Sequence, residues 1–144
     1  MKNLILLASL FFATLASFAC QGDRIITFEQ LPKEAQQFVT THFPTIKVSY
    51  VKQDGRTYEV RLTDGTEIEF SHKGQWENID GNHNVLPQSI ITLLPATLTN
   101  HISTQFPDTQ ITKIDKDRRH IEIELNNGLE MVFSSSGEFL RLED

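Results

Sequence analysis

The sequence contains one cysteine, Cys20, among its 144 residues, and this scarcity excludes an intramolecular disulfide. The fold must therefore be held together by its apolar core. Basic side chains are also scarce, because 13 Lys and Arg stand against 19 Asp and Glu and give a formal net charge of −6. Such a chain is a poor partner for nucleic acid and is not attracted electrostatically to an anionic membrane.

Long hydrophobic runs are missing except at the N-terminus, where residues 4–16 are almost uninterrupted apolar sequence. Lys2 precedes this run, and Ser17-Phe18-Ala19 follows it with small residues at the two positions that signal peptidase reads. The run is shorter than the roughly 20 residues of a membrane-spanning helix. We therefore predict a cleaved signal peptide over residues 1–19 and an exported protein of the periplasm or cell envelope.

Cys20 directly follows the predicted cleavage site, and two interpretations remain open. Its position resembles that of the lipid-carrying cysteine of bacterial lipoproteins, although Ser17 departs from the Leu which that pattern prefers. Ordinary cleavage would instead leave a free thiol on residues 20–26, which we predict to be an N-terminal tether. Loss of Lys2 with the signal changes the net charge to 12 − 19 = −7, so membrane contact is expected only through a lipid on Cys20.

The chain repeats itself with a constant offset of 63 residues. The matches include Leu31-Pro32 with Leu94-Pro95, Phe43-Pro44 with Phe106-Pro107, Gly65 with Gly128, Phe70-Ser71 with Phe133-Ser134 and Gly74 with Gly137. A fixed period of this size indicates one supersecondary unit per copy. We predict a first repeat over residues 27–80, a linker over 81–89 and a second repeat over 90–144. Units of about 55 residues bury a core only marginally, so the two copies are expected to pack together.

Each copy begins with helical periodicity and continues with an alternating pattern. Apolar residues recur at helical spacing between Leu31 and Phe43, and prolines stand near both ends of this stretch. Apolar and charged residues alternate afterwards, as in strands with one buried face. The predicted fold is α+β, with two tandem copies of a helix packed on an about four-stranded antiparallel sheet.

The turn between the two central strands fixes their register. A two-residue turn at Asp64-Gly65 would set Leu62 opposite Glu67 and mix the two faces. A three-residue loop over residues 63–65 instead sets Val60 opposite Ile68, with Gly65 in a left-handed conformation. The second copy follows the same rule, which predicts the pairs Ile123 with Met131, Ile121 with Phe133 and Leu125 with Leu129.

These features together resemble one known family: Leu-Pro before the helix, Phe-Pro at its end, the Gly turn, Phe-Ser-x-x-Gly and a following aromatic residue. In them the chain resembles the PepSY-like, beta-lactamase-inhibitor-like proteins, and both copies take part. The resemblance implies tandem helix-on-sheet units outside the cytoplasm, often lipid-anchored. It implies little about function, and no inhibitory loop of the family is matched residue by residue.

One face of the predicted sheet carries many glutamates. The register opposes Arg61 with Glu67, Glu59 with Glu69, and Glu124 with Glu130, and like charges directly opposite each other destabilise a sheet. The face suits a basic partner or cations, although ordinary solvated positions are the alternative. Trp76 either packs in the core or anchors a partner. The candidate partner-binding residues are Glu59, Arg61, Glu67, Glu69, Glu122, Glu124, Glu130 and Trp76.

No catalytic or metal-binding motif is present in the sequence. Cys20 has no neighbouring base, Ser134-Ser135-Ser136-Gly137 is a turn sequence, and the paired carboxylates are expected to be exposed. The five histidines form no short ligand pair. We predict no enzymatic activity, no cofactor and no metal.

The predicted function is a non-enzymatic binding module of the cell envelope, which inhibits or modulates another envelope protein. The alternative is a periplasmic sensor or carrier of small cationic ligands or divalent cations that uses the glutamates directly. The partner, the oligomeric state and the membrane face are not specified by the sequence.

Overall fold

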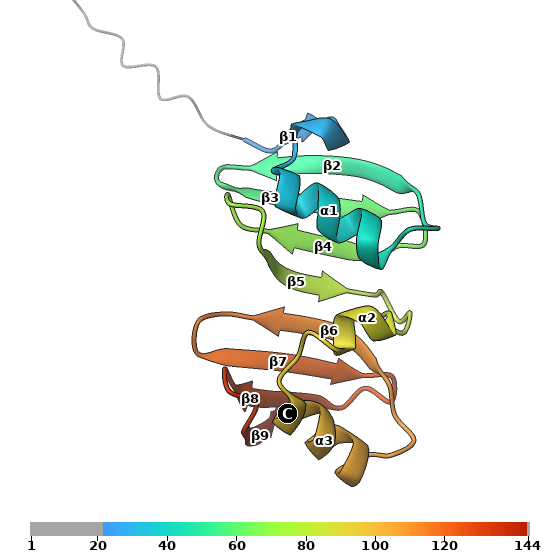
Figure 1. The fold of residues 1–144 in the computed structure, drawn as a ribbon, viewed down its shortest axis with the longest axis vertical. Coiled ribbons are helices and arrows are strands. Elements are labelled where there is room, and N and C mark those ends of the chain that lie inside the picture. Colours follow the sequence, from blue (N-terminus) through green and yellow to red (C-terminus); the bar gives the residue numbers. More distant parts are fainter. Residues whose placement is uncertain (1–21, 144) are drawn as a thin grey trace, which may run out of the picture.

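The computed structural model describes residues 22–143, so the predicted signal peptide and Cys20 lie outside it (Figure 1). The first half contains β1 (Arg24–Ile26), the 3-10 helix η1 (Phe28–Gln30), α1 (Lys33–His42), β2 (Val48–Asp54), β3 (Thr57–Leu62), β4 (Glu67–Phe70) and β5 (Trp76–Asp80). The second half contains α2 (Gln88–Ile91), α3 (Ala96–Gln105), β6 (Ile111–Lys116), β7 (His120–Leu125), β8 (Glu130–Ser134) and β9 (Phe139–Glu143). No helix within residues 22–143 is long and apolar enough to cross a membrane.

All strands of the described residues form one antiparallel sheet, in the order β1 to β9. The α+β class is therefore confirmed, but two separate sheets of about four strands are not what the structure shows. The last strand of the first half, β5, pairs with the first strand of the second half, β6, and sets Ile79 opposite Ile114. Joining the two edges satisfies backbone groups that would otherwise face solvent, and it buries both isoleucines completely.

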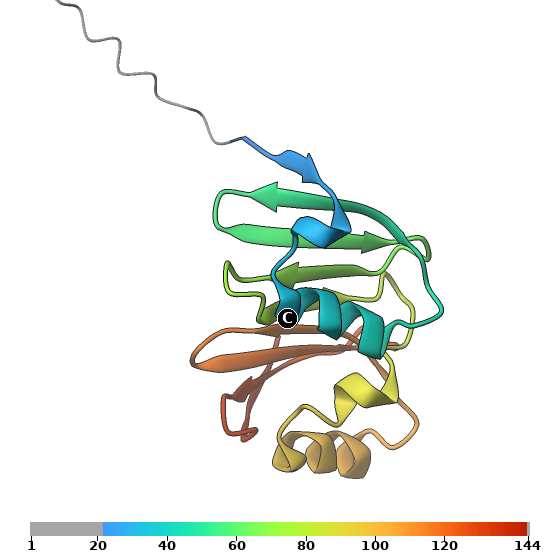
Figure 2. The same cartoon turned by 45° about the horizontal axis from the view of Figure 1, so that its top comes forward.

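The helices cover one face of this sheet and leave the other open (Figures 1 and 2). A row of apolar side chains crosses the covered face from strand to strand, through the junction and into both halves. It consists of Val51, Val60, Ile68, Ile79, Ile114, Ile123 and Met131, each at most 2% exposed. The two repeats thus share a continuous core, as expected for units too small to bury a large core alone.

The predicted hairpin registers are confirmed in both halves. Val60 lies opposite Ile68 and Tyr58 opposite Phe70, while Ile123 lies opposite Met131. Gly65 has a φ of +93°, the left-handed conformation that the three-residue loop requires.

Besides the 3-10 helix η1, two short elements were not predicted. The strand β1 lies inside the predicted tether and pairs with β2, where Arg24 donates a hydrogen bond to Gln53. The helix α2 overlaps the end of the predicted linker, and Oγ of its residue Ser89 lies 2.8 Å from Nδ1 of His42 at the end of α1. Both elements add contacts where the sequence predicted only connections.

The turn before the last strand of each half packs against the start of that half's helix. A Cβ added to Gly74 would lie 2.8 Å from Cβ of Pro32, and one added to Gly137 would lie 2.7 Å from Cβ of Pro95. Both glycines have positive φ. The prolines stand at the N-cap positions, one residue before the helices begin. The Leu-Pro and Gly matches in the sequence therefore correspond to one repeated helix–turn contact.

Candidate functional site on the open sheet face

The open face carries two cross-strand rows of side chains. The first row is Tyr50, Arg61, Glu67, Asp80, Lys113, Glu124, Glu130 and Glu143. The second row is Lys52, Glu59, Glu69, Asn78, Asp115, Glu122, Val132 and Arg141. The structure thus brings together every candidate partner-binding residue of the sequence analysis except Trp76.

The carboxylates over β3 are neutralised within the protein. Glu59 accepts a hydrogen bond from the Tyr50 hydroxyl at 2.8 Å, and Nζ of Lys52 lies 3.0 Å from its other oxygen. Burial raises the pKa of Glu59, but these two partners outweigh burial and hold it below its usual range. Arg61 forms an ion pair with Glu67 on the next strand. This part of the face is therefore balanced in charge.

Glu69 on β4 has no such partner. Burial and the nearby carboxylates of Glu67, Asp115 and Glu59 raise the pKa of Glu69 above its usual range. Burial is the larger cause, and the neighbouring carboxylates add negative charge around Glu69. A nearby cation from a partner would relieve it.

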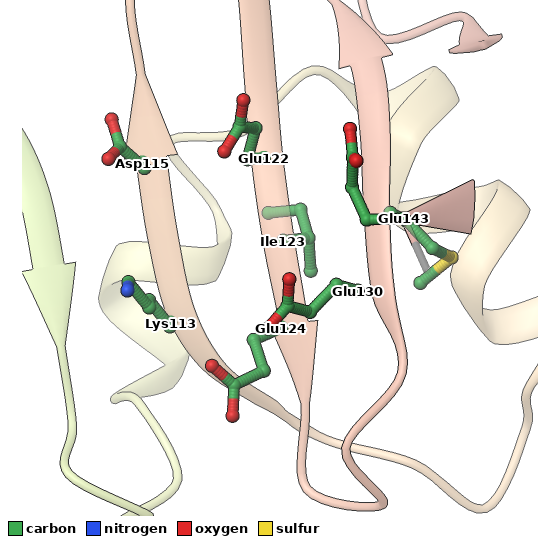
Figure 3. A pocket seen from close by; sticks show the side chains of 8 residues that line it. Lys113, Asp115, Glu122, Ile123, Glu124, Glu130 and Glu143 are labelled. Atoms are coloured by element: carbon green, nitrogen blue, oxygen red, sulfur yellow. The ribbon is translucent and has the colours of Figure 1, made fainter. Parts of the chain in front are cut away.

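The excess of negative charge on the open face continues across the junction of the two repeats onto the second half. Among the described residues, five carboxylates of the open face form no ion pair, and we call them the carboxylate patch: Glu69, Asp115, Glu122, Glu124 and Glu130. Four of them surround a small hollow of about 60 Å³ over β6, β7 and β8, in which Asp115 lies beside Glu122 and Glu124 beside Glu130 (Figure 3). Lys113 borders this hollow, but its Nζ lies 3.8 Å from Asp80 on the neighbouring strand.

This arrangement concentrates negative charge on the open face. Glu124 and Glu130 are directly opposite each other, a placement that costs about 0.2–1 kcal/mol in a sheet. Within residues 22–143, no group of three or more His, Cys, Asp or Glu side chains is arranged to hold a metal ion. The patch can attract a cationic group, and the open sheet face around it is not covered by any helix of the described chain.

Sequence reasoning missed several residues of this face. Asp80 and Asp115 were not assigned because their alignment depends on the pairing of β5 with β6, which the sequence did not reveal. Lys52 and Lys113 lie on the first long strand of each repeat, whose facing the sequence left open. The 63-residue repeat alone did not contain this information, because Lys113 corresponds to Tyr50.

Trp76 lies on the helix side of the sheet, away from the carboxylate patch. Its ring stacks on Phe38 of α1 with centroids 5.9 Å apart, and Phe70 is its cross-strand neighbour. Nζ of Lys116 lies 3.6 Å from the centroid of the indole. Trp76 therefore belongs to a second surface, between the two halves.

The family comparison matches both halves of the chain. The model described as "Putative beta-lactamase-inhibitor-like, PepSY-like" matches residues 18–63 and again residues 56–141. The chain belongs to this PepSY-like family. No curated protein matches this PepSY-like chain.

Three solved structures from Bacteroides share the PepSY-like chain's fold over nearly their whole length. A "putative calcium-regulated periplasmic protein" of Bacteroides thetaiotaomicron is 33% identical, with a TM-score of 0.79 over 85% of this chain and 97% of its own. A "putative periplasmic protein of unknown function" from Bacteroides vulgatus is 33% identical, with a TM-score of 0.77 over 85% and 100%. A "putative periplasmic protein from DUF2874 family" of the same species is 29% identical, with a TM-score of 0.79 over 87% and 99%.

Proposed function

We propose that this protein is an exported, non-enzymatic binding module of the periplasm that binds a basic segment of another envelope protein through the carboxylate patch. The observation that carries the proposal is the uneven charge balance of the open face. Glu59 and Glu67 form ion pairs with Lys52 and Arg61, and Glu59 also accepts a hydrogen bond from Tyr50, whereas the five patch carboxylates have no ion-pair partner in the described structure. Electrostatic complementarity of this kind gives specificity and fast association.

The family and the relatives support this proposal. The family description names an inhibitor-like protein, and an inhibitor acts by binding. The related Bacteroides structures are described as periplasmic proteins, which agrees with the signal peptide predicted over residues 1–19. Modulation of the bound protein and a lipid on Cys20 are parts of the same proposal. The lipid would hold the module close to other envelope proteins.

A second candidate function is the binding of divalent or small organic cations by the same patch. Two observations favour it: the hollow between the patch carboxylates, and the description of a 33% identical relative as "putative calcium-regulated". Calcium prefers six to eight oxygen ligands, so the separated carboxylates would have to move together or share the ion with water.

Affinity capture from the envelope fraction of the producing cell tests the main proposal. The bait is residues 22–143, and the variant is Glu124→Lys with Glu130→Lys. The matched control, Glu29→Lys with Glu138→Lys, makes the same change of charge at exposed positions off the open face. A protein retained by the wild type and the control but lost by the patch variant supports the proposal. Equal retention by all three baits contradicts it.

Thermal unfolding with added calcium chloride or spermidine tests the second candidate. A rise in Tm for the wild type and the control, absent in the patch variant, would support cation binding. If neither salt raises the Tm of the wild type, this candidate is wrong. Any ligand that binds only the folded state must raise its stability.

A further inference from the structure

The junction of the two halves creates a cleft on the helix side of the sheet. An aromatic cluster forms part of its lining. Phe38 of α1 stacks on Trp76 with an interplanar angle of 29°, and Phe70 meets Phe38 edge-on with centroids 5.7 Å apart. Phe38 and Trp76 line a cleft of about 720 Å³ between α1, the turn after β4 and the turn after β6. This volume lies within the range of small-molecule sites.

The second half repeats the cluster without the cleft. His101 stacks on Phe139 with centroids 4.6 Å apart, and Phe133 meets His101 edge-on. In the described structure no strand follows β9, so nothing lies beside Phe139 as β6 lies beside Trp76. The walled cleft therefore arises only where the second repeat adjoins the first.

The second repeat also supplies a cation to this cleft. Lys116, at the end of β6, places its Nζ 3.6 Å from the centroid of the Trp76 ring and is half-buried. It forms no ion pair with any residue of the described chain. Burial lowers the pKa of Lys116, and the nearby carboxylate of Glu77 offsets only part of this effect. The indole offsets part of the lost hydration through a cation–π contact, but it supplies no counter-charge. The equivalent residue of the first repeat is the uncharged Gln53.

One wall of the cleft is a turn that packs against α1, and the lining contains two further cations and three acidic residues. The turn over residues 71–75 is held against α1 by the close approach at Gly74. Lys73 and Arg118 line the cleft beside Lys116, in a chain that is acidic overall. Of the acidic lining residues Glu34, Glu77 and Asp117, the last already accepts hydrogen bonds from the backbone N–H groups of the following turn at 2.6 and 2.8 Å.

We propose that this cleft binds a small organic anion whose negatively charged group lies beside Lys116 and whose flat or apolar body lies against Trp76 and Phe38. The charged group would form the ion pair that Lys116 lacks in the described chain. The aromatic rings offer contact area to the remainder of the ligand. The site is separate from the carboxylate patch, which lies on the opposite face of the sheet.

Tryptophan fluorescence reports on this cleft directly, because Trp76 is the only tryptophan of the chain. Residues 22–143 are titrated at constant ionic strength with benzoate, with the neutral isostere benzamide, and with acetate. We expect a saturable change of emission with benzoate, and affinities for benzamide and acetate that are at least about tenfold weaker, which corresponds to 1.4 kcal/mol.

The matched variants are Lys116→Gln, which introduces the residue found at the equivalent position of the first repeat, and Lys47→Met, which removes an exposed lysine elsewhere. Lys116→Gln should weaken benzoate binding about tenfold or more, and Lys47→Met should leave it unchanged. Circular dichroism of both variants checks that they are folded. The proposal is overturned if benzoate causes no saturable change, if benzamide binds equally well, or if Lys116→Gln binds benzoate like the wild type.

A different observation concerns the outer edge of β9. In the first half, the equivalent strand β5 has its outer edge covered by β6, whereas no strand of the described chain covers β9. Phe139, Leu140 and Leu142 on β9 are 40%, 47% and 48% exposed. Exposed apolar residues on an open edge are typical of strands that pair with another chain.

The hydrogen-bonding groups of β9 define which residue can pair outward. The N–H of Ser134 donates to the carbonyl of Glu138 across the turn between β8 and β9. Since the direction alternates along an antiparallel strand, Val132 and Glu130 also face β9, where they pair with Arg141 and Glu143. The N–H and C=O of Leu142 therefore point away from the sheet.

The charged residues of β9 would be complementary to those of a second β9 strand that pairs with it antiparallel. Arg141 and Glu143 lie on the same face, one on each side of Leu142, and form an ion pair within the strand. If two copies pair antiparallel with Leu142 opposite Leu142, each Arg141 lies opposite Glu143 of the other copy. We infer that β9 pairs in this register with β9 of a second copy, which joins the two sheets about a two-fold axis.

Sedimentation equilibrium of residues 22–143 tests this dimer. Arg141→Glu and Glu143→Arg each place like charges opposite one another twice, and each should weaken dimerisation at least tenfold. The double variant with both substitutions restores opposite charges in the same register and should dimerise like the wild type. The inference is wrong if the wild type is monomeric up to about 1 mM, if the single variants dimerise equally well, or if the double variant fails to recover.

Discussion

Replacing Ile79 by alanine tests whether the two halves share one core. Ile79 lies on β5 with no exposed surface, opposite Ile114 on β6 and Ile68 on β4. The substitution removes three buried carbon atoms from the strand pair that joins the repeats. It leaves the charged residues of the open face unchanged.

The expected loss follows from the burial. Three buried methylene or methyl groups at about 0.8 kcal/mol each give roughly 2.4 kcal/mol, and the residual cavity adds to this. We expect Ile79→Ala to lower the free energy of unfolding by about 3 kcal/mol. Leu93→Ala, at a position that is 50% exposed and lies outside the proposed interfaces, is the control and should cost less than about 1.5 kcal/mol.

Urea unfolding followed by two signals measures this loss. Trp76 fluorescence reports on the first half and its junction, whereas far-ultraviolet circular dichroism reports on both halves. The shared sheet predicts coincident transitions in the wild type and an equal shift of both signals in Ile79→Ala. Separate transitions for the two signals, or a cost below about 1 kcal/mol, would refute the reasoning.

Three further predictions concern charge and backbone conformation. Glu69→Gln should stabilise the protein at pH 7 by about 0.2–1 kcal/mol. The folded state raises the pKa of Glu69, so this gain should vanish in unfolding experiments below about pH 4.3, where the glutamate is protonated in both the folded and the unfolded state. Asp117→Ala should destabilise the protein at neutral pH, and the difference from the wild type should shrink as pH falls below about 3.9, because backbone N–H groups lower the pKa of Asp117 in the folded state. Gly137→Ala should lower the stability measured by thermal unfolding more than Gly128→Ala does. Both glycines have positive φ, so both substitutions introduce about 1–3 kcal/mol of backbone strain, but only a Cβ at position 137 meets neighbouring atoms. Equal losses of stability would show that the close approach to α3 is unimportant.

Much of each repeat could be predicted from the sequence, because its determinants are local. The alternation around Val60 and Ile68 admits one hairpin register that keeps apolar residues on one face, and Gly65 fits the turn that this register needs. The 63-residue offset then transferred the same assignment to Ile123 and Met131. Neither inference required contacts between distant parts of the chain.

The joining of the repeats could not be predicted in the same way. The pairing of β5 with β6 depends on two strands that are separated by a linker and two helices. It decides that Asp115 joins the glutamates on the open face and that Lys116 reaches Trp76 on the other. The sequence therefore predicted the glutamates of the candidate site but not how far the site extends across the sheet. Trp76 lies on the opposite face.

Carbodiimide labelling of carboxylates, read out by peptide mass spectrometry, tests the central claim most directly. The protein is labelled in the intact envelope of the producing cell and again after purification. If the carboxylate patch binds a partner, labelling of Glu122, Glu124 and Glu130 should be lower in the envelope, while Glu29 and Glu138 should be labelled equally in both samples. Equal labelling of the patch in the two samples would contradict the account.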